Sequence, residues 1–483
     1  MASTLPAPTF RDPGGTVTVG PEDVVRSIHH SHAADMLAFL ETPLCRRLVA
    51  EGRLVSSQIL SPATTTGPLL LIHPRIAFAS FSWEWPPALW LAAAELTLTL
   101  CADLVKEGWI LKDGTPLNVL FQGANPVFVD VLSIQRLDER RPLWFAYGQF
   151  VRTFLLPMIA HSQLGWPLHS VLMRRDGFEP EEIFTALPWP RRLTRPALTA
   201  ITLPILLESI FGSARSRTRT KTSPTTGPSD TVHPAEISSS AILLKDDPEL
   251  TRHIIGRSLT RLRKAMHTAM PPPRRSTWTG YAENAPHYSG EDHLAKRRFV
   301  TEMLTRCRPH RVLDVGCNTG VYSRLAAAAG AEVVAIDTDL QAVDRLCCEL
   351  RGDGSSILPL CVDLAHPTPA TGWNNRETLS FLDRSTGHFD TVLMLAVLHH
   401  LLLTSQIPLD DIAALCRRIT THHLIVEWIP PTDPMFREVL RGREALYTHI
   451  TESAFRQAFS LHFESLNEIT LHNGRVIQHL TRR

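Results

Sequence analysis

From residue 311 to the C-terminus, short apolar runs alternate strictly with amphipathic stretches, a pattern typical of a parallel β-sheet with crossover helices. A helix at 452–459 then precedes two apolar runs separated by Asn473-Gly474, which is a hairpin signal. The expected strands are 311–315, 332–337, 357–362, 389–395, 424–428, 463–471 and 476–480, and the expected crossover helices are 321–329, 340–351, 376–383 and 409–419. The sequence therefore predicts an α/β domain whose parallel core is closed by an antiparallel hairpin.

The first expected strand runs into an Asp-Val-Gly-Cys-Asn-Thr-Gly loop at residues 314–320. Glycines let such a loop approach a ligand, and the N-terminal amides of the following helix point toward it. The second strand ends in Asp337, where a carboxylate can bind ribose hydroxyls, and the third ends in Asp363, placed to receive an adenine amino group. Three carboxylates at successive strand ends favour a neutral or cationic nucleoside, because they would repel a pyrophosphate.

These motifs resemble those of class I S-adenosylmethionine-dependent methyltransferases, and the resemblance covers residues 296–483. The four similar stretches are 312–320, 334–337, 361–363 and 389–395. The resemblance implies a seven-stranded Rossmann-like sheet, S-adenosyl-L-methionine as cofactor and methyltransferase activity (EC 2.1.1.-). It places the loop glycines at the methionine portion, Asp337 at ribose and Asp363 at adenine. The implied cofactor residues are Asp314, Gly316, Cys317, Asn318, Gly320, Asp337, Asp363, Leu364 and Leu395.

The alternative for this domain is a dinucleotide-binding Rossmann fold. Its loop would read Gly-x-Gly-x-x-Gly, and residues 314–320 do not follow that pattern.

Three residues near the ends of the fourth and fifth strands are candidates for catalysis. An oxygen or nitrogen acceptor usually needs a base, and His399 and His400 follow the fourth strand at the rim where open α/β sheets bind ligands. Glu427 reaches the same rim from the fifth strand. The histidines could instead pack the next helix, and the glutamate could serve a structural hydrogen bond.

The N-terminal half contains a helical run at 89–106, apolar on most sides, followed by Asp113, Asn118 and Asp130. This spacing resembles the catalytic loop and metal-binding aspartate of a protein-kinase-like fold, a mainly helical α+β domain. The resemblance implies Asp113 as base and Asn118 and Asp130 as magnesium ligands for ATP. No lysine precedes Lys106, so an arginine, Arg53 or Arg75, would replace the usual phosphate-pairing lysine. A degenerate binding domain or a simple turn remain alternatives.

The expected organisation is a kinase-like accessory or substrate domain at 1–211, a flexible linker at 212–236 and a methyltransferase domain at 237–483, with its core at 296–483. The linker is rich in Ser, Thr, Pro and Arg and poor in apolar residues. Most of the chain resembles a bacterial methyltransferase family that includes host-specific nodulation proteins. That resemblance is carried by residues 73–76, 83–86, 111–118, 147–150, 372–377 and 427–434.

Composition excludes several other classes. Lys plus Arg (49) nearly cancels Asp plus Glu (48), so there is no overall field for nucleic acid or anionic membrane. The eight cysteines are scattered without metal-ligand spacing, which predicts free thiols in the cytoplasm and no metal centre. The start of the chain does not resemble a signal peptide, and the charged, proline-containing stretch 83–105 is a poor transmembrane span.

The sequence therefore predicts transfer of a methyl group to a small molecule or conjugated metabolite. Two alternatives stay open: a bifunctional kinase and methyltransferase, and a scaffold that binds nucleosides without turning them over. No pattern in the sequence indicates an oligomeric state.

Overall fold

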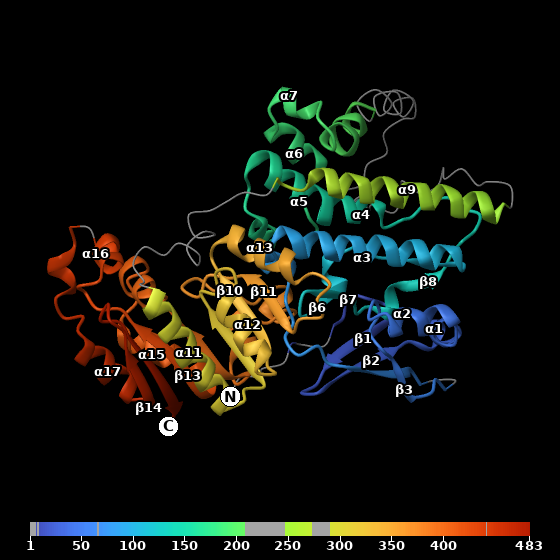
Figure 1. The fold of residues 1–483 in the computed structure, drawn as a ribbon. Coiled ribbons are helices and arrows are strands. Elements are labelled where there is room, and N and C mark those ends of the chain that lie inside the picture. The colour runs from blue at the N-terminus through green and yellow to red at the C-terminus, as the bar shows by residue number, and fades with distance from the viewer. Residues whose placement is uncertain (1–5, 7–8, 65–66, 208–246, 273–289, 441) are drawn as a thin grey trace, which may run out of the picture.

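The computed structural model describes residues 6, 9–64, 67–207, 247–272, 290–440 and 442–483, so the predicted linker at 212–236 lies outside the described residues. The described chain forms two units that lie side by side (Figure 1). The C-terminal unit is built around one large sheet. The N-terminal unit combines a smaller sheet with a helical region.

The C-terminal sheet has seven strands in the order β11-β10-β9-β12-β13-β15-β14. The first five strands in this order run parallel, and β15 is antiparallel to both of its neighbours. The parallel core and its closing hairpin agree with the pattern in the sequence. The strands are β9 (Arg311–Val315), β10 (Glu332–Asp337), β11 (Ile357–Cys361), β12 (Phe389–Met394), β13 (Thr420–Trp428), β14 (Phe463–Thr470) and β15 (Val476–Arg482).

The helices of this unit are α11 (Gly290–Cys307), α12 (Val321–Ala328), α13 (Leu340–Leu350), α14 (Phe381–Ser385), α15 (Leu409–Ile419), α16 (Pro434–Leu440) and α17 (Glu452–Ser460). The helix expected at 376–383 is displaced toward the C-terminus. Ser380 accepts a hydrogen bond from the amide of Asp383 and thereby caps α14, while Thr371 and Thr378 form a β-bridge just before it. The capping side chain, and not the apolar pattern, sets where this helix begins.

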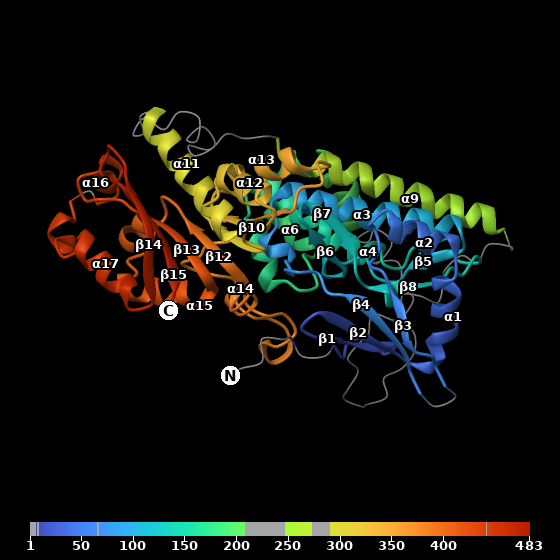
Figure 2. The same ribbon diagram turned by 60° about the horizontal axis from the view of Figure 1, so that its bottom comes forward.

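The N-terminal unit contains a four-stranded antiparallel sheet in the order β1-β2-β4-β3 and two separate strand pairs, β5 with β8 and β6 with β7 (Figure 2). Its strands are β1 (Gly15–Val19), β2 (Asp23–Ile28), β3 (Gln58–Ser61), β4 (Leu69–Pro74), β5 (Trp109–Leu111), β6 (Val119–Gln122), β7 (Asn125–Phe128) and β8 (Ile134–Arg136). Its helices include α1 (His30–Leu40), α2 (Pro43–Ala50), α3 (Pro87–Lys106), α4 (Tyr147–Phe150), α5 (Leu156–Ile159), α6 (Pro180–Ala186) and α7 (Trp189–Arg192).

Helix α3 forms the centre of the N-terminal core. By length and hydropathy it could cross a membrane, but 78% of its most apolar window is buried inside the protein, as in the core helix of a soluble domain. Helix α9 (Pro248–Ala269) packs along α3 with a stripe of buried apolar side chains (Figure 1). Residues 248–269 therefore belong with the N-terminal unit, which corrects the prediction of a methyltransferase domain extending over 237–483. The apolar stripe of a helix does not reveal which unit the helix will cover.

A buried ion pair joins the two units. Glu84 is completely buried, and its carboxylate pairs with Arg384 of α14 and accepts a hydrogen bond from the Thr368 hydroxyl at 2.6 Å. The Arg384 guanidinium also lies over the ring of Phe78. A second contact forms where the Asp344 carboxylate accepts a hydrogen bond from the amide of Ala88 at 2.7 Å. These contacts fix the start of α3 against the C-terminal unit.

We expect Glu84→Gln to destabilise the protein by about 3–5 kcal/mol, because Arg384 would keep its charge in a buried site without a counter-charge. Urea unfolding followed by tryptophan fluorescence would measure this loss. The matched control is Asp383→Asn, which removes the partner of Arg418 in an exposed ion pair and should cost less than about 1 kcal/mol. Equal losses in the two variants would contradict the prediction.

Candidate active site

The loop after β9 adopts a conformation that few residues tolerate. Gly316, Asn318 and Gly320 all have positive φ, at 71°, 49° and 81°. A Cβ atom on Gly316 would lie 2.2 Å from the Cγ2 atom of Val397, so this position requires glycine. Asparagine tolerates the left-handed region better than most side chains, which explains Asn318 in place of a glycine. The loop is thus a tight cradle at the carboxyl ends of the strands.

Asp337 ends β10 beside this cradle. One carboxylate oxygen accepts a hydrogen bond from the amide of Asn318 at 2.8 Å, and the other accepts one from the amide of Asp339 at 2.9 Å. Burial raises the pKa of Asp337, and these backbone hydrogen bonds act in the opposite direction. Each oxygen retains a second lone pair that can accept a hydrogen bond from a hydroxyl group.

Asp314 lies deeper, near the end of β9, and is 2% exposed. It accepts a hydrogen bond from the Ser323 hydroxyl at 2.5 Å. Burial raises the pKa of Asp314 to about 7, while the Ser323 hydrogen bond and the charge of Lys296 lower it. The carboxyl group is therefore set to gain or lose its proton near neutral pH, according to what binds beside it.

The remaining predicted cofactor residues lie on the same edge. The Asp363 carboxylate follows β11, accepts a hydrogen bond from the amide of Ala365 at 2.8 Å and is 44% exposed. Leu364 and Leu395 are buried, and so is Cys317, whose amide donates a hydrogen bond to the carbonyl of Ile336. Burial raises the pKa of the Cys317 thiol, so Cys317 contributes packing and a backbone position.

His399 and His400 begin the segment that follows β12, and their ring centroids are 4.1 Å apart. His399 is 4% exposed, and its Nδ1 has no hydrogen-bond partner among the described residues. Burial lowers the pKa of both rings, and for His399 the nearby charges of Arg475 and Lys296 lower it further. A neutral imidazole with an unused buried nitrogen is available to a bound ligand.

Glu427 ends up in a buried charge network. It is fully buried, accepts a hydrogen bond from Lys296 at 2.6 Å and lies 3.6 Å from Arg475. Arg475 also binds Asp433 through a bond of 2.8 Å. Burial lowers the pKa of Lys296, and the Glu427 charge raises it. In this geometry Glu427 neutralises Lys296 and Arg475 and is not accessible as a base.

Sequence reasoning missed Lys296, Arg475 and Asp433 as members of the site. The only signal was the position of Lys296, which lies on the buried face of α11 together with Phe299 and Met303. A lysine on an otherwise apolar stripe needs a buried counter-charge, but the helix pattern does not identify the partner.

In the N-terminal unit, Asp130 forms an ion pair with Arg26 of β2 at 2.7 Å. Neither of the two arginines expected in place of a lysine pairs with Asp130, since Arg53 pairs with Asp103 and Arg75 binds the carbonyls of Gly20 and Pro21. The register of the antiparallel sheet, which only the fold reveals, turns Arg26 toward Asp130.

A cavity of about 500 Å³ lies between the two units and contains this ion pair. Asn118 lines it as well, and its Nδ2 atom is buried without a hydrogen-bond partner among the described residues. Asp113 is not among the lining residues, and burial and the charge of Asp130 raise its pKa. Several stretches of the nodulation-protein resemblance meet here, from both units, including residues 73–76, Trp83, Gly372 and Glu377.

Comparison with known proteins agrees with this architecture. Residues 288–458 match a family described as a methyltransferase domain, so the C-terminal unit carries a methyltransferase domain and the protein is a methyltransferase. Nodulation protein NoeA of Rhizobium meliloti (strain 1021) is 31% identical over 461 residues, which cover 94% of this chain and 91% of NoeA. The chain belongs to the NoeA family.

Solved structures with similarity to this chain include the N-methyltransferase NodS from Bradyrhizobium japonicum WM9. The two sequences are 12% identical, the match covers 40% of this chain and 98% of NodS, and the TM-score is 0.28. Another is the magnesium protoporphyrin IX methyltransferase from Synechocystis PCC 6803, solved with bound SAH. The sequences are 20% identical, the match covers 42% of this chain and 95% of that chain, and the TM-score is 0.29.

Proposed function

We propose that this protein transfers a methyl group from S-adenosyl-L-methionine to a small molecule or conjugated metabolite. The observation that carries the proposal is the set of three carboxylates, Asp314, Asp337 and Asp363, around a left-handed loop at one edge of the sheet. The cofactor would supply an electrophilic methyl group on a cationic sulfur. The cradle at Gly316 and the free lone pairs of Asp337 fit a nucleoside with a cationic amino-acid tail.

Each carboxylate has its own part in this proposal. Asp337 binds the ribose hydroxyls, because it ends β10 beside the loop and already has its backbone hydrogen bonds. Asp363 is exposed enough to accept a hydrogen bond from the adenine amino group. Asp314 binds the α-ammonium group, since a buried carboxyl group gains most from a cationic partner.

The acceptor would lie beside His399. Its unused Nδ1 atom can accept a proton from an oxygen or nitrogen acceptor, and the nearby cations keep the ring neutral at physiological pH. The Lys296–Glu427–Arg475 network positions this wall of the site. Because its relative NoeA is a nodulation protein, we place the acceptor among metabolites or conjugates made during nodulation.

We also place the protein in the cytoplasm as a soluble enzyme. All eight cysteines are free, as a reducing compartment favours, and the most apolar long helix is buried in the core.

The binding of S-adenosylhomocysteine, measured by calorimetry, tests the cofactor site. We expect Asp337→Ala to weaken binding about 10- to 100-fold, as the loss of hydrogen bonds to a charged group would do. The matched control is Glu332→Ala at the exposed opposite end of the same strand, which should bind as the wild type does. Wild-type binding as weak as that of Asp337→Ala would contradict the proposed cofactor.

Transfer of a labelled methyl group from the cofactor into an extract of nodulating bacteria tests the reaction, with Asp337→Ala as the inactive control. Labelled product that is soluble and of low molecular mass would support a metabolite acceptor. Label found only in protein or RNA would contradict it, and tight cofactor binding with no product in any fraction would favour a non-catalytic scaffold.

The protonation of Asp314 predicts how cofactor affinity depends on pH. Below about pH 7 the free protein holds a proton on this carboxyl group, and that proton must leave before an ammonium group can pair with it. We therefore expect the affinity for S-adenosylhomocysteine to fall about tenfold from pH 8 to pH 6. Asp314→Asn should bind weakly with no such slope, and an equal slope in this variant would contradict the assignment.

We further propose that the N-terminal unit binds a nucleotide with magnesium. The Arg26–Asp130 ion pair and Asn118 support this, because they lie together in the cavity and because carboxylate and amide oxygens suit magnesium. The cavity lining also contains arginines, Arg75 among them, and guanidinium groups suit phosphate groups. The proposal covers binding and not phosphoryl transfer, since Asp113 lies outside the lining.

A thermal-shift assay with ATP and magnesium tests this second proposal. Ligand at 100 times its dissociation constant stabilises a protein by about 2.7 kcal/mol, which would give a clear rise in Tm. Asp130→Asn should lose the rise, whereas Asp138→Asn, a change in an exposed ion-pair residue of the same unit, should keep it. No rise in the wild type, or an equal rise in Asp130→Asn, would contradict the proposal.

A further inference from the structure

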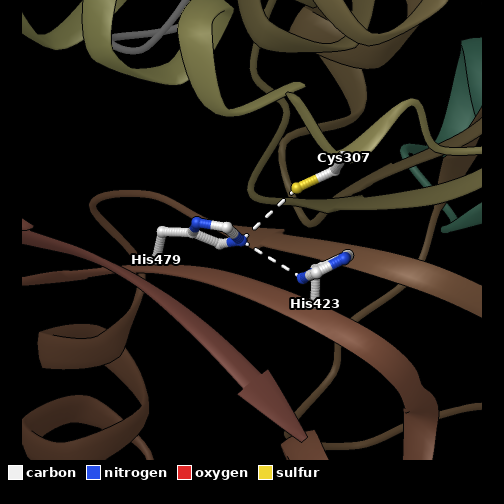
Figure 3. Close-up of side chains that lie close together, drawn as sticks. All are labelled: Cys307, His423 and His479. Atoms are coloured by element: carbon white, nitrogen blue, oxygen red, sulfur yellow. Dashed lines mark hydrogen bonds between the residues drawn. The ribbon is translucent and has the colours of Figure 1, made fainter. Parts of the chain in front are cut away.

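Three side chains with metal-binding atoms meet near the amino ends of the parallel strands, at the edge of the sheet opposite to the cofactor loop (Figure 3). Cys307 is the last residue of α11, His423 is near the start of β13, and His479 is in β15. In the strand register, Ile425 lies opposite His479, so the two histidines are diagonal neighbours on one face of the sheet. No two of these residues are close in sequence, so their spacing gave no sign of a metal centre.

Two of the distances between these atoms are close to the edges of a zinc tetrahedron. Bonds of about 2.3 Å to sulfur and about 2.0–2.1 Å to nitrogen place tetrahedral ligand atoms about 3.5 Å apart for S and N and about 3.4 Å apart for two N atoms. The Cys307 Sγ atom lies 3.4 Å from His479 Nε2, and His479 Nε2 lies 3.2 Å from His423 Nδ1. All three ligand atoms lie within 4.8 Å of one another.

Hydrogen bonding explains this cluster poorly. The Nε2 atom of His479 has either one proton or one lone pair, yet it lies at hydrogen-bond distance from two groups. A single nitrogen cannot make a good hydrogen bond to both of them. A metal ion between the three atoms could bind all of them at once.

The surroundings supply the outer contacts that metal sites usually have. The Asn467 side-chain amide lies 3.4 Å from Nδ1 of His479, and turning this amide would let its oxygen accept the Nδ1 proton and orient the ring. The Oδ2 atom of Asp390 accepts hydrogen bonds from the backbone amides of His310 and Arg311. Its Oδ1 atom is buried without a hydrogen-bond partner among the described residues. The charge of Asp390 acts on both Cys307 and His423, so this carboxylate belongs to the surroundings of the cluster.

We propose that Cys307, His423 and His479 bind one Zn²⁺ ion, with a water molecule as the fourth ligand. Binding forms bonds from Sγ and the two ring nitrogens to zinc, and the thiol proton passes to solvent. The ion ties the end of α11 to the adjacent strands β13 and β15. Its role is structural, because the site lies across the sheet from the loop that would bind the cofactor.

Metal content and stability of the full-length protein test this proposal. After dialysis against zinc and removal of free metal, we expect about one zinc per chain and a Tm that falls when a strong chelator is added. Cys307→Ser and His423→Asn should each lower zinc affinity more than about 100-fold, and Asn467→Ala should lower it about 10- to 100-fold. Cobalt in place of zinc should show a thiolate charge-transfer band that Cys307→Ser abolishes.

Two other residues, a histidine next to the cluster and a cysteine outside it, provide controls. His422→Asn changes the adjacent histidine, whose Nδ1 contacts the Thr421 hydroxyl, and Cys348→Ser changes an exposed cysteine. Both should keep zinc binding, and every variant should keep its S-adenosylhomocysteine binding if it is folded. The proposal is overturned if the wild type takes up no zinc, or if folded Cys307→Ser and His423→Asn take up as much as the controls.

Discussion

The buried pairing of Glu84 with Arg384 determines how the two halves of this protein relate to each other. Both groups have been removed from water, and neither has another opposite charge beside it among the described residues, so loss of either group would leave the other as an unpaired buried charge. The pair lies next to the start of α3, where the carboxylate of Asp344 accepts a hydrogen bond from the amide of Ala88. The core helix of one unit is thereby fixed against the sheet of the other.

This attachment brings distant parts of the sequence to one cavity. Strand β4 and the segment before α3 contribute one wall, and residues 371–379, which lie between β11 and β12, contribute another. Asp363, at the end of β11, belongs to the proposed cofactor site, so a short stretch of chain connects the two proposed ligand sites.

Local pattern predicted the C-terminal fold well. The strands, the Asn473-Gly474 hairpin and the acidic strand ends follow from periodicity and turn chemistry, which act over a few residues. Pairing between side chains far apart in sequence was not predictable in this way. Lys296 with Glu427, Arg26 with Asp130 and Cys307 with His479 are separated by 131, 104 and 172 residues, and only the strand register and helix packing bring them together.

The packing of α9 on α3 changes where the chain can be divided. The chain before residue 208 and α9 belong to the same unit, so the Ser/Thr/Pro-rich stretch between them is a connection within that unit. A C-terminal fragment starting at residue 237 would contain α9 without α3, the helix on which it packs. The apolar stripe of α9 would then be exposed, namely Ile255, Leu259, Leu262 and Met266. The remaining N-terminal fragment would expose the matching flank of α3, and both pieces would tend to aggregate.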